Sequence, residues 1–173
     1  MIEEYKEYLS LLYQRIPEYV YEVGLAIFIV VAVTIFLVAG FRKGWRGVLA
    51  LLLMEYLFLI YCSTVIFRKT NGTSKYKPTS LENYKEAIVS SSHIAPEMLM
   101  NVLVFIPLGM LICGVLKGRN WLLSLMIGCG VSVSIEVLQF VFKRGFTEVV
   151  DVFHNTLGCL LGICIYKLFS HVV

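Results

Sequence analysis

Charged residues are scarce in this sequence of 173 residues, where Asp, Glu, Lys and Arg together make up 16% of the chain. Hydrophobic residues make up 58%, and the mean hydropathy is +0.80. A water-soluble domain needs more polar surface, so this composition excludes that class and is typical of a membrane protein. The net charge of +3 is small and the basic residues are scattered, so we predict no nucleic-acid partner.

The sequence also lacks the common catalytic and metal-binding motifs. It has no P-loop, no GxGxxG after a strand, no GxSxG and no HExxH. The five cysteines are odd in number, lie in apolar stretches and show neither CxxC nor zinc spacing, so we expect them to pack. His93 and His154 are expected on one membrane side, but such a pair is a weak zinc signal. We therefore predict no metal ligands and name no cofactor.

Five long apolar stretches are present instead, each close to the 20 or so residues that a helix needs to cross a bilayer. They are residues 23–41, 48–67, 98–116, 121–142 and 149–169. Apart from the loop at residues 68–97, the connections between them are short, which leaves no room for a separate soluble domain. The sequence therefore predicts an all-α fold in which residues 21–173 form one bundle of about five transmembrane helices.

The segment at residues 1–20 has a different character. It begins with acidic residues where a secretory signal carries positive charge, and no small-residue cleavage site follows, so we expect it to be retained. Apolar residues recur at steps of three and four, namely Ile2, Tyr5, Leu9, Leu12 and Ile16. This pattern predicts an amphipathic helix lying on the membrane surface and interrupted by Pro17; a mobile tail is the alternative.

Lys and Arg residues near the span ends indicate the orientation of the chain. Arg42, Lys43 and Arg46 are concentrated in the first connection, whereas the basic residues of the long loop are spread along it. This density favours a cytoplasmic first connection, which places the N-terminus outside and the C-terminus in the cytoplasm. The total number of basic residues on each side leaves the opposite orientation open.

Several carboxylates and amides lie inside the apolar stretches, where a polar group is costly unless it faces a cavity or a partner. Glu136 and Gln139 are three residues apart near the end of the fourth stretch, so they share one helix face. Glu148, Asp151 and Asn155 follow at i, i+3 and i+7 around the start of the fifth. Because the short turn KRGFT joins these helices, they must be antiparallel neighbours, and all five side chains must lie on one membrane side.

The start of the third stretch is expected on that side too, and it carries Asn101. We predict one shallow polar pocket with Arg144 at its rim as a counter-charge, and its ligand-binding residues are Asn101, Glu136, Gln139, Arg144, Glu148, Asp151 and Asn155. In an enzyme, the catalytic residues would be Glu136, Glu148 and Asp151. The alternative is a structural network of ion pairs, although three acids against one or two bases favour a bound cation, a proton or a cationic ligand.

Small residues at four-residue spacing continue these helix faces deeper into the membrane: Gly128, Ser132, Gly158 and Gly162. Such spacing lets helices approach closely in lipid, and we expect packing within the chain; a homodimer interface is the alternative. Glu55 is a separate case in the middle of LLLMEYLFLI, where it could hydrogen-bond to another helix or take part in proton transfer.

Three motifs occur together between residues 96 and 166. They are NVLVFIPLG at residues 101–109, Glu-x-x-Gln at 136–139, and Glu-x-x-Asp-x-x-x-Asn-Thr-x-Gly at 148–158. With these separations the chain resembles the VanZ-like family. It departs from the family pattern at Met100 and Glu148, where relatives commonly carry Asp, and its first two spans match in hydropathy alone.

The resemblance implies a plasma-membrane protein of a Gram-positive bacterium that is associated with resistance to teicoplanin. Teicoplanin is a lipoglycopeptide whose fatty-acyl chain holds it beside its cell-wall precursor target at the outer leaflet. We therefore expect an outward-facing pocket that binds or modifies an envelope ligand, such as a lipid-linked cell-wall precursor or the lipoglycopeptide. The alternatives are a membrane enzyme that acts on a lipid-linked substrate through carboxylates, with or without a divalent metal, and a small proton-coupled transporter.

Overall fold

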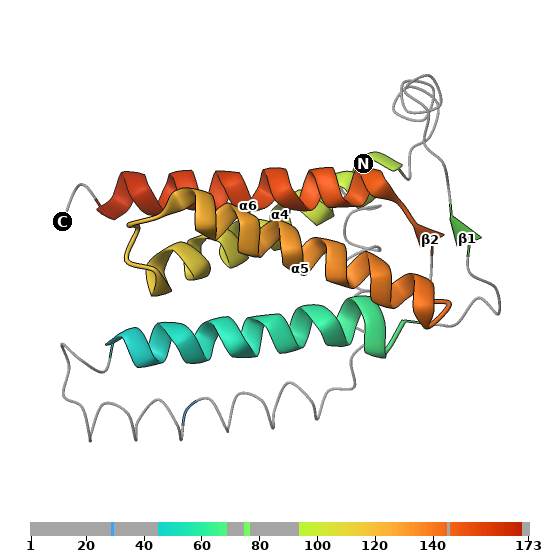
Figure 1. Cartoon of the computed structure of the whole chain (residues 1–173), viewed down its shortest axis with the longest axis horizontal. Helices are drawn as coiled ribbons and strands as arrows, with labels where there is room; N and C mark the ends of the chain where they lie inside the picture. The colour runs from blue at the N-terminus through green and yellow to red at the C-terminus, as the bar shows by residue number, and fades with distance from the viewer. Residues whose placement is uncertain (1–28, 30–44, 69–74, 77–93, 145, 171–173) are drawn as a thin grey trace.

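The computed structural model describes residues 29, 45–68, 75–76, 94–144 and 146–170. The long elements of this part are all helical (Figure 1): the Trp45–Ile66 helix with its π-helical last turn η1 (Cys62–Ile66), α4 (Ile94–Val115), α5 (Trp121–Val141) and α6 (Val149–Ser170). Two short strands, β1 (Lys75–Tyr76) and β2 (Phe146–Thr147), pair in parallel. The prediction of a helical bundle is confirmed for this part, and the strand pair adds a short link between two loops.

Each of the four helices is long and apolar enough to cross a membrane. The candidate spans are Trp45–Ile66, Met98–Val115, Trp121–Val141 and Val149–Ser170. They agree with four of the predicted stretches. The largest difference is at the start of the first described span, which begins at residue 45, whereas the sequence predicts residue 48. The remaining predicted span at residues 23–41, apart from residue 29, and the surface helix predicted over residues 1–20 lie outside the described residues.

The connections on either side of α5 contain the same turn. Lys117 follows α4 with a φ of 60°, and Lys143 follows α5 with a φ of 56°. In both turns the next N–H donates to the carbonyl oxygen five residues earlier, at 2.8 Å. This is the Schellman ending, which satisfies helix-end carbonyls and redirects the chain within a few residues. Helices α5 and α6 are therefore antiparallel neighbours, as predicted.

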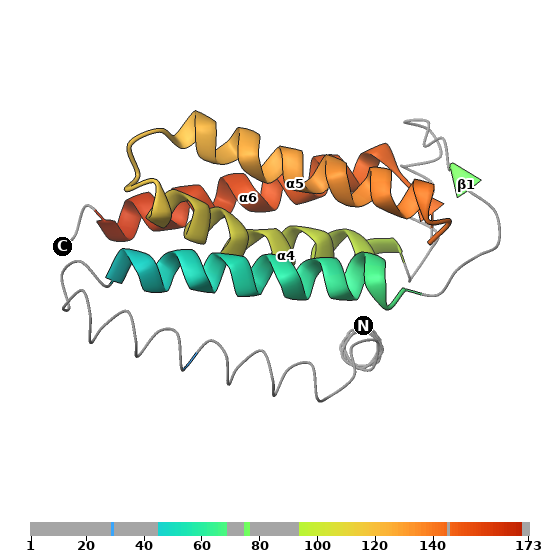
Figure 2. The ribbon, with the colours of Figure 1, turned by 60° about the horizontal axis from the view of Figure 1, so that its bottom comes forward.

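Helices α4 and α6 lie side by side and run in the same direction (Figure 2). A Cβ atom at Gly158 would collide with the carbonyl oxygen of Val102, and one at Gly162 would collide with that of Ile106. The two glycines, one turn apart, thus let the backbones of α4 and α6 touch, which favours association in a medium without a hydrophobic driving force. The predicted packing of these glycines within the chain is confirmed.

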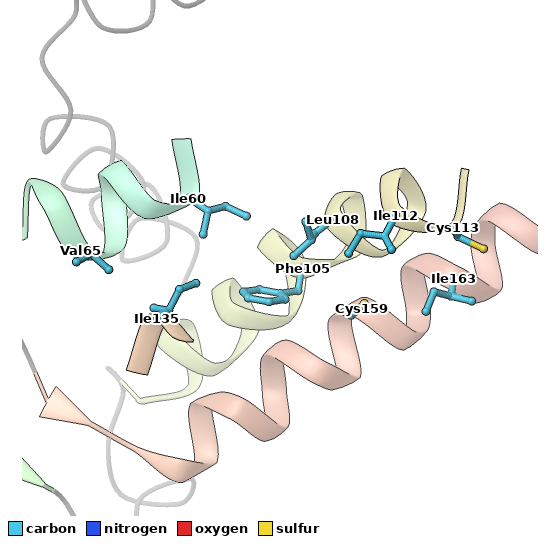
Figure 3. Packing of buried hydrophobic residues seen from close by; sticks show 9 residues of the cluster. All are labelled: Ile60, Val65, Phe105, Leu108, Ile112, Cys113, Ile135, Cys159 and Ile163. Atoms are coloured by element: carbon cyan, nitrogen blue, oxygen red, sulfur yellow. The ribbon is translucent and has the colours of Figure 1, made fainter. Parts of the chain in front are cut away.

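Buried apolar side chains from all four helices fill the interior of the bundle. They are Ile60, Val65, Phe105, Leu108, Ile112, Cys113, Ile135, Cys159 and Ile163 (Figure 3). The outward faces are also largely apolar, and Phe140, Phe153 and Leu168 are among the large exposed side chains. An apolar exterior around an apolar core fits a surface that is covered by lipid chains.

Polar positions gather at one end of the bundle. There the Trp45–Ile66 helix and α5 end, while α4 and α6 begin (Figures 1 and 2). This confirms the predicted arrangement in which the starts of the third and fifth spans share a side with the end of the fourth.

Candidate functional site

A set of polar side chains lies on α5 and at the start of α6 at this end, and we call it the polar cluster. It consists of Ser132, Glu136, Gln139, Glu148, Asp151 and Asn155. The exposed fractions are 0% for Ser132, 6% for Glu136, 3% for Gln139 and 5% for Asn155, so these four are more than nine-tenths buried. Glu148 and Asp151 are half-buried. Four of the predicted site residues, Glu136, Glu148, Asp151 and Asn155, therefore lie along the contact between α5 and α6, where Ser132 joins them, and Gln139 lies one turn further along α5.

The positions of the cluster follow from the antiparallel contact of α5 with α6. Every fourth residue of α5 meets every fourth residue of α6, and from the middle of the bundle outward the pairs are Gly128 with Cys159, Ser132 with Asn155, and Glu136 with Asp151. Asn155 donates from Nδ2 to Oγ of Ser132 at 2.8 Å. Polarity therefore rises step by step from the membrane interior to the end of the bundle.

Glu136 connects the end of α5 to the beginning of α6. Its Oε2 atom accepts a hydrogen bond from the backbone N–H of Glu148, at 3.0 Å. Glu148 immediately precedes α6, and N–H groups at a helix start lack an acceptor within the helix. A carboxylate is favourable there because the helix N-terminus carries a partial positive charge. Glu136 thus caps a neighbouring helix.

Gln139 reaches in another direction, toward the end of the Trp45–Ile66 helix. Its Nε2 donates to the carbonyl oxygen of Thr64 at 3.1 Å. Thr64 lies in η1, where the N–H of Phe67 donates to the carbonyl oxygen of Cys62 at 2.9 Å, five residues back. Single π-helical turns within α-helices occur frequently at functional sites. Gln139 therefore links the polar cluster to the one irregular turn of this helix.

Arg144, in the turn between α5 and α6, also contacts the end of the Trp45–Ile66 helix. Its Nη1 donates to the carbonyl oxygens of Val65 at 2.9 Å, Ile66, and Arg68 at 3.0 Å. A guanidinium is favourable at a helix C-terminus, where carbonyls are unsatisfied and the helix dipole is negative. The sequence predicts Arg144 as a rim counter-charge, whereas the described hydrogen bonds of its guanidinium go to main-chain oxygens. A second arginine that follows the same helix, Arg68, attracts the carboxylate of Glu136 electrostatically.

Two oxygen atoms of the polar cluster are buried without a hydrogen-bond donor among the described residues. They are Oε1 of Gln139 and Oδ1 of Asn155, whose amide nitrogens are both engaged. Buried polar atoms almost always have a partner, and leaving one unsatisfied costs about 1–3 kcal/mol. The polar cluster therefore has spare hydrogen-bond acceptors in an apolar environment.

Asn101 and Glu55 lie apart from these contacts. Asn101 is half-buried near the start of α4, and no described hydrogen bond joins it to the polar cluster. Glu55 is half-buried in the middle of the Trp45–Ile66 helix, and both interpretations of its role remain predictions. In the part of the chain that the structure describes, no three His, Cys, Asp or Glu side chains gather as a metal-binding group.

Four apolar helices that pack as one bundle, with buried polar side chains at one end, define a multi-pass helical membrane protein. Residues 25–170 match the model of the family described as VanZ/LLP1. The chain is also 31% identical over 128 residues to Protein VanZ from Enterococcus faecium, which covers 71% of this chain and 73% of that protein. The chain thus belongs to the VanZ/LLP1 family. No solved structure matches it.

The family assignment confirms the resemblance expected from the three motifs and extends it from residues 96–166 to nearly the whole chain. At the level of the family, this is a membrane protein associated with teicoplanin resistance.

Proposed function

We propose that this chain contributes to teicoplanin resistance by binding a cell-envelope ligand at the polar cluster, on the outer surface of the membrane. The observation that carries the proposal is the pair of buried amide oxygens on Gln139 and Asn155, which have no donor among the described residues. A network that only held the helices together would be expected to satisfy its own buried atoms. Spare acceptors beside the Glu136 carboxylate fit a site that receives a hydrogen-bond donor from outside the chain.

The orientation that we propose has the N-terminus outside and the C-terminus in the cytoplasm. It puts the turn with Lys117 and Arg119 on the cytoplasmic side, together with the basic first connection, as the positive-inside rule favours. The polar cluster then lies at the outer surface. A lipoglycopeptide held there by its acyl chain would share the membrane surface with the cluster and with the cell-wall precursor.

Susceptibility testing of site variants addresses the function directly. Glu136→Gln, Asp151→Asn and Asn155→Ala are expressed in a teicoplanin-susceptible host and tested against teicoplanin and a glycopeptide without an acyl chain. We expect each variant to lose protection against teicoplanin at unchanged membrane levels, which are measured by immunoblot. The control is Asn120→Ala at the opposite end of the bundle, which should protect like the wild type. Full protection by all three site variants would show that the polar cluster is not the active element.

Labelling with a membrane-impermeant maleimide addresses the orientation. Lys143 and Ser170 are exposed near opposite ends of α6, and the wild-type chain supplies the background from its own cysteines. We expect Lys143→Cys to react in intact cells and Ser170→Cys to react only after permeabilisation. The reverse pattern would show that the polar cluster faces the cytoplasm, where it could not meet teicoplanin at the outer leaflet.

A further inference from the structure

We infer that the end of the bundle opposite the polar cluster binds the headgroup of an anionic phospholipid. Arg46, Lys117, Arg119 and Lys167 lie at this end, and we call it the basic end. The inference goes beyond the proposed function, which concerns the other end of the molecule. Three observations carry it: the charge of the basic end, the contacts that join its helix ends, and its apolar surroundings.

The charge of the basic end has one sign. Here the Trp45–Ile66 helix and α5 begin, while α4 and α6 end, at the left of Figures 1 and 2. The sequence contains no Asp or Glu in the segments that form this end, which are residues 45–49, 114–124 and 163–170. In the part of the chain that the structure describes, the four basic side chains have no carboxylate partner. Their positive charge therefore attracts an anion from outside the chain.

The ring of Tyr166 joins three helices at the basic end. A Cβ atom at Gly114 in α4 would lie 3.3 Å from Cε2 of Tyr166 and 3.4 Å from Cδ1 of Leu49, so both side chains contact the last turn of α4. A Cβ atom at Gly118, in the turn that follows α4, would lie 3.4 Å from Cε1 of the same ring. The start of the Trp45–Ile66 helix and the ends of α4 and α6 therefore converge around one aromatic side chain.

Each of these three helix ends carries a basic residue beside the contact. Lys117 is next to Gly118 in sequence, Lys167 is next to the tyrosine, and Arg46 lies one helical turn before the leucine. Lys167 also interacts electrostatically with Cys113 in α4. Basic side chains at the ends of spanning helices extend their charged groups to the membrane surface. Positive groups from three helices thus border one patch of that surface, which suits a single phosphate group.

The apolar surroundings of the basic end favour a lipid over a soluble anion. Large apolar side chains are exposed directly beside the basic residues, namely Trp45, Trp121, Leu122, Leu168 and Phe169. Tryptophan is enriched at the level of lipid headgroups, and basic groups between transmembrane helices bind anionic headgroups. A phosphodiester supplies negative charge and hydrogen-bond acceptors to the basic side chains, while the acyl chains of the same molecule cover the apolar surface. A free phosphate would provide only the first of these.

Tryptophan fluorescence tests the inference, because both tryptophans of the chain, Trp45 and Trp121, lie at the basic end. The full chain is reconstituted in vesicles that contain phosphatidylglycerol or phosphatidylcholine with brominated acyl chains, which quench the tryptophans they contact. We expect phosphatidylglycerol to bind at this end about tenfold more tightly than phosphatidylcholine. Each lipid occupies both leaflets, so the orientation of the chain does not affect the result. Equal quenching by the two lipids at equal mole fraction would overturn the inference.

Substitutions assign the lipid preference to named side chains. Lys167→Gln should lower the relative affinity for phosphatidylglycerol about fivefold, which is the contribution expected of one basic group near a membrane surface, and Lys167→Arg should retain it. The triple variant Arg46→Gln, Lys117→Gln and Lys167→Gln should bind both lipids alike. The matched control is Lys143→Gln, which removes an exposed lysine at the polar end and should change nothing.

Quenching by phosphatidylcholine should stay the same in every variant, so a loss confined to phosphatidylglycerol cannot come from misfolding. A triple variant that keeps the preference for phosphatidylglycerol would contradict the inference. So would an equal loss of preference in Lys143→Gln, because it would show that the total charge of the chain, and not the basic end, attracts the lipid.

Inorganic phosphate distinguishes the lipid from a free anion. It is added to the vesicles with phosphatidylglycerol, and chloride at matched ionic strength is the control. We expect neither salt to relieve the quenching more than the other. Relief by phosphate alone would show that the ligand is a soluble anion and would overturn the lipid assignment. The proposed function is tested by teicoplanin susceptibility of the polar-cluster variants, so the two proposals fail separately.

Discussion

Helix α5 is bounded by the same backbone turn at both ends, with Lys117 before it and Lys143 after it in the left-handed conformation. At the first end the polar contacts are local: exposed Asn120 accepts through Oδ1 from the N–H of Leu123 at 3.0 Å. At the second end they cross the bundle, and Arg144 reaches Val65, which is 79 residues away in sequence. The two turns thus share a backbone geometry and differ in what their side chains contact.

The turn geometry itself therefore does not distinguish the two ends. A Schellman ending satisfies carbonyls of its own helix wherever it occurs. Long-range side-chain contacts arise at the polar end because the neighbouring helices there present unsatisfied groups, namely the carbonyls of η1 and the first N–H groups of α6. Four experiments separate the two ends, beginning with the largest expected effect.

The first experiment removes the helix contact on which both ends depend. Gly162→Val places side-chain atoms where the carbonyl oxygen of Ile106 lies, so α4 and α6 must separate, and we expect a loss of about 3 kcal/mol or more in unfolding free energy. The control is Gly130→Ala, because nothing lies within 4 Å of that position, and it should gain about 0.5–1 kcal/mol. Denaturant titration in detergent measures both. A Gly162→Val protein as stable as the wild type would contradict the close helix contact.

The second experiment compares the arginines of the two turns. Arg144→Gln removes charge-assisted hydrogen bonds to three carbonyl oxygens, and we expect unfolding free energy to fall by about 2 kcal/mol. Arg119→Gln changes an exposed side chain and should alter it by less than about 0.5 kcal/mol. Thermal unfolding at matched detergent concentration measures the difference. Equal losses would mean that the carbonyl contacts of Arg144 contribute no stability.

The third experiment compares one cap at each end and measures teicoplanin protection as well as stability. Glu136→Gln keeps an acceptor for the N–H of Glu148 and removes a buried negative charge that Asp151 and Glu148 repel, so we expect the unfolding free energy to change by less than about 0.5 kcal/mol. Asn120→Ala removes the cap on Leu123 and should cost about 1 kcal/mol. Only Glu136→Gln should lose teicoplanin protection. Equal loss of protection in both variants would mean that stability rather than the polar cluster governs the phenotype.

The smallest effect is expected where the two ends are alike. Lys117→Gly and Lys143→Gly both relieve a left-handed conformation that a side chain disfavours, so each should stabilise the protein by about 0.5–1 kcal/mol. The two changes should be equal within error, because the backbone is the same. A stabilisation at one turn and a destabilisation at the other, seen by thermal unfolding, would show that one lysine side chain makes a contact of its own.

The sequence was sufficient for the four described spans and for the pairing of α5 with α6. Apolar length predicts where helices cross a membrane, and the short turn at residues 143–147 leaves antiparallel packing as its simplest geometry. Spacing placed Glu136 with Gln139, and Asp151 with Asn155, on shared helix faces. The GxxxG spacing of Gly158 and Gly162 predicted a close contact, but it did not identify α4 as the partner, because any helix can approach such a surface.

The cross-bundle hydrogen bonds could not be predicted in this way. Periodicity shows which face a residue occupies and says nothing about which helix that face meets. The partners of Gln139 and Arg144 lie 75 to 79 residues away in a helix whose last turn departs from α geometry. Ser132 was noted only as a small residue, although it binds Asn155. The available signal for this contact was the Ser132 hydroxyl, which lies one helical turn from Glu136 on the same face of α5.

The π-helical turn has a consequence for comparing this chain with its relatives. A π-helical turn contains in effect one residue more than an α-helix needs. A deletion of one residue within Cys62–Ile66 would restore α geometry and rotate the following backbone by about 100°. The carbonyl oxygens that Gln139 and Arg144 now bind would then point elsewhere. In an alignment, a gap of one position here would therefore mark a relative in which these cross-bundle hydrogen bonds differ, even where every polar residue of the cluster is retained.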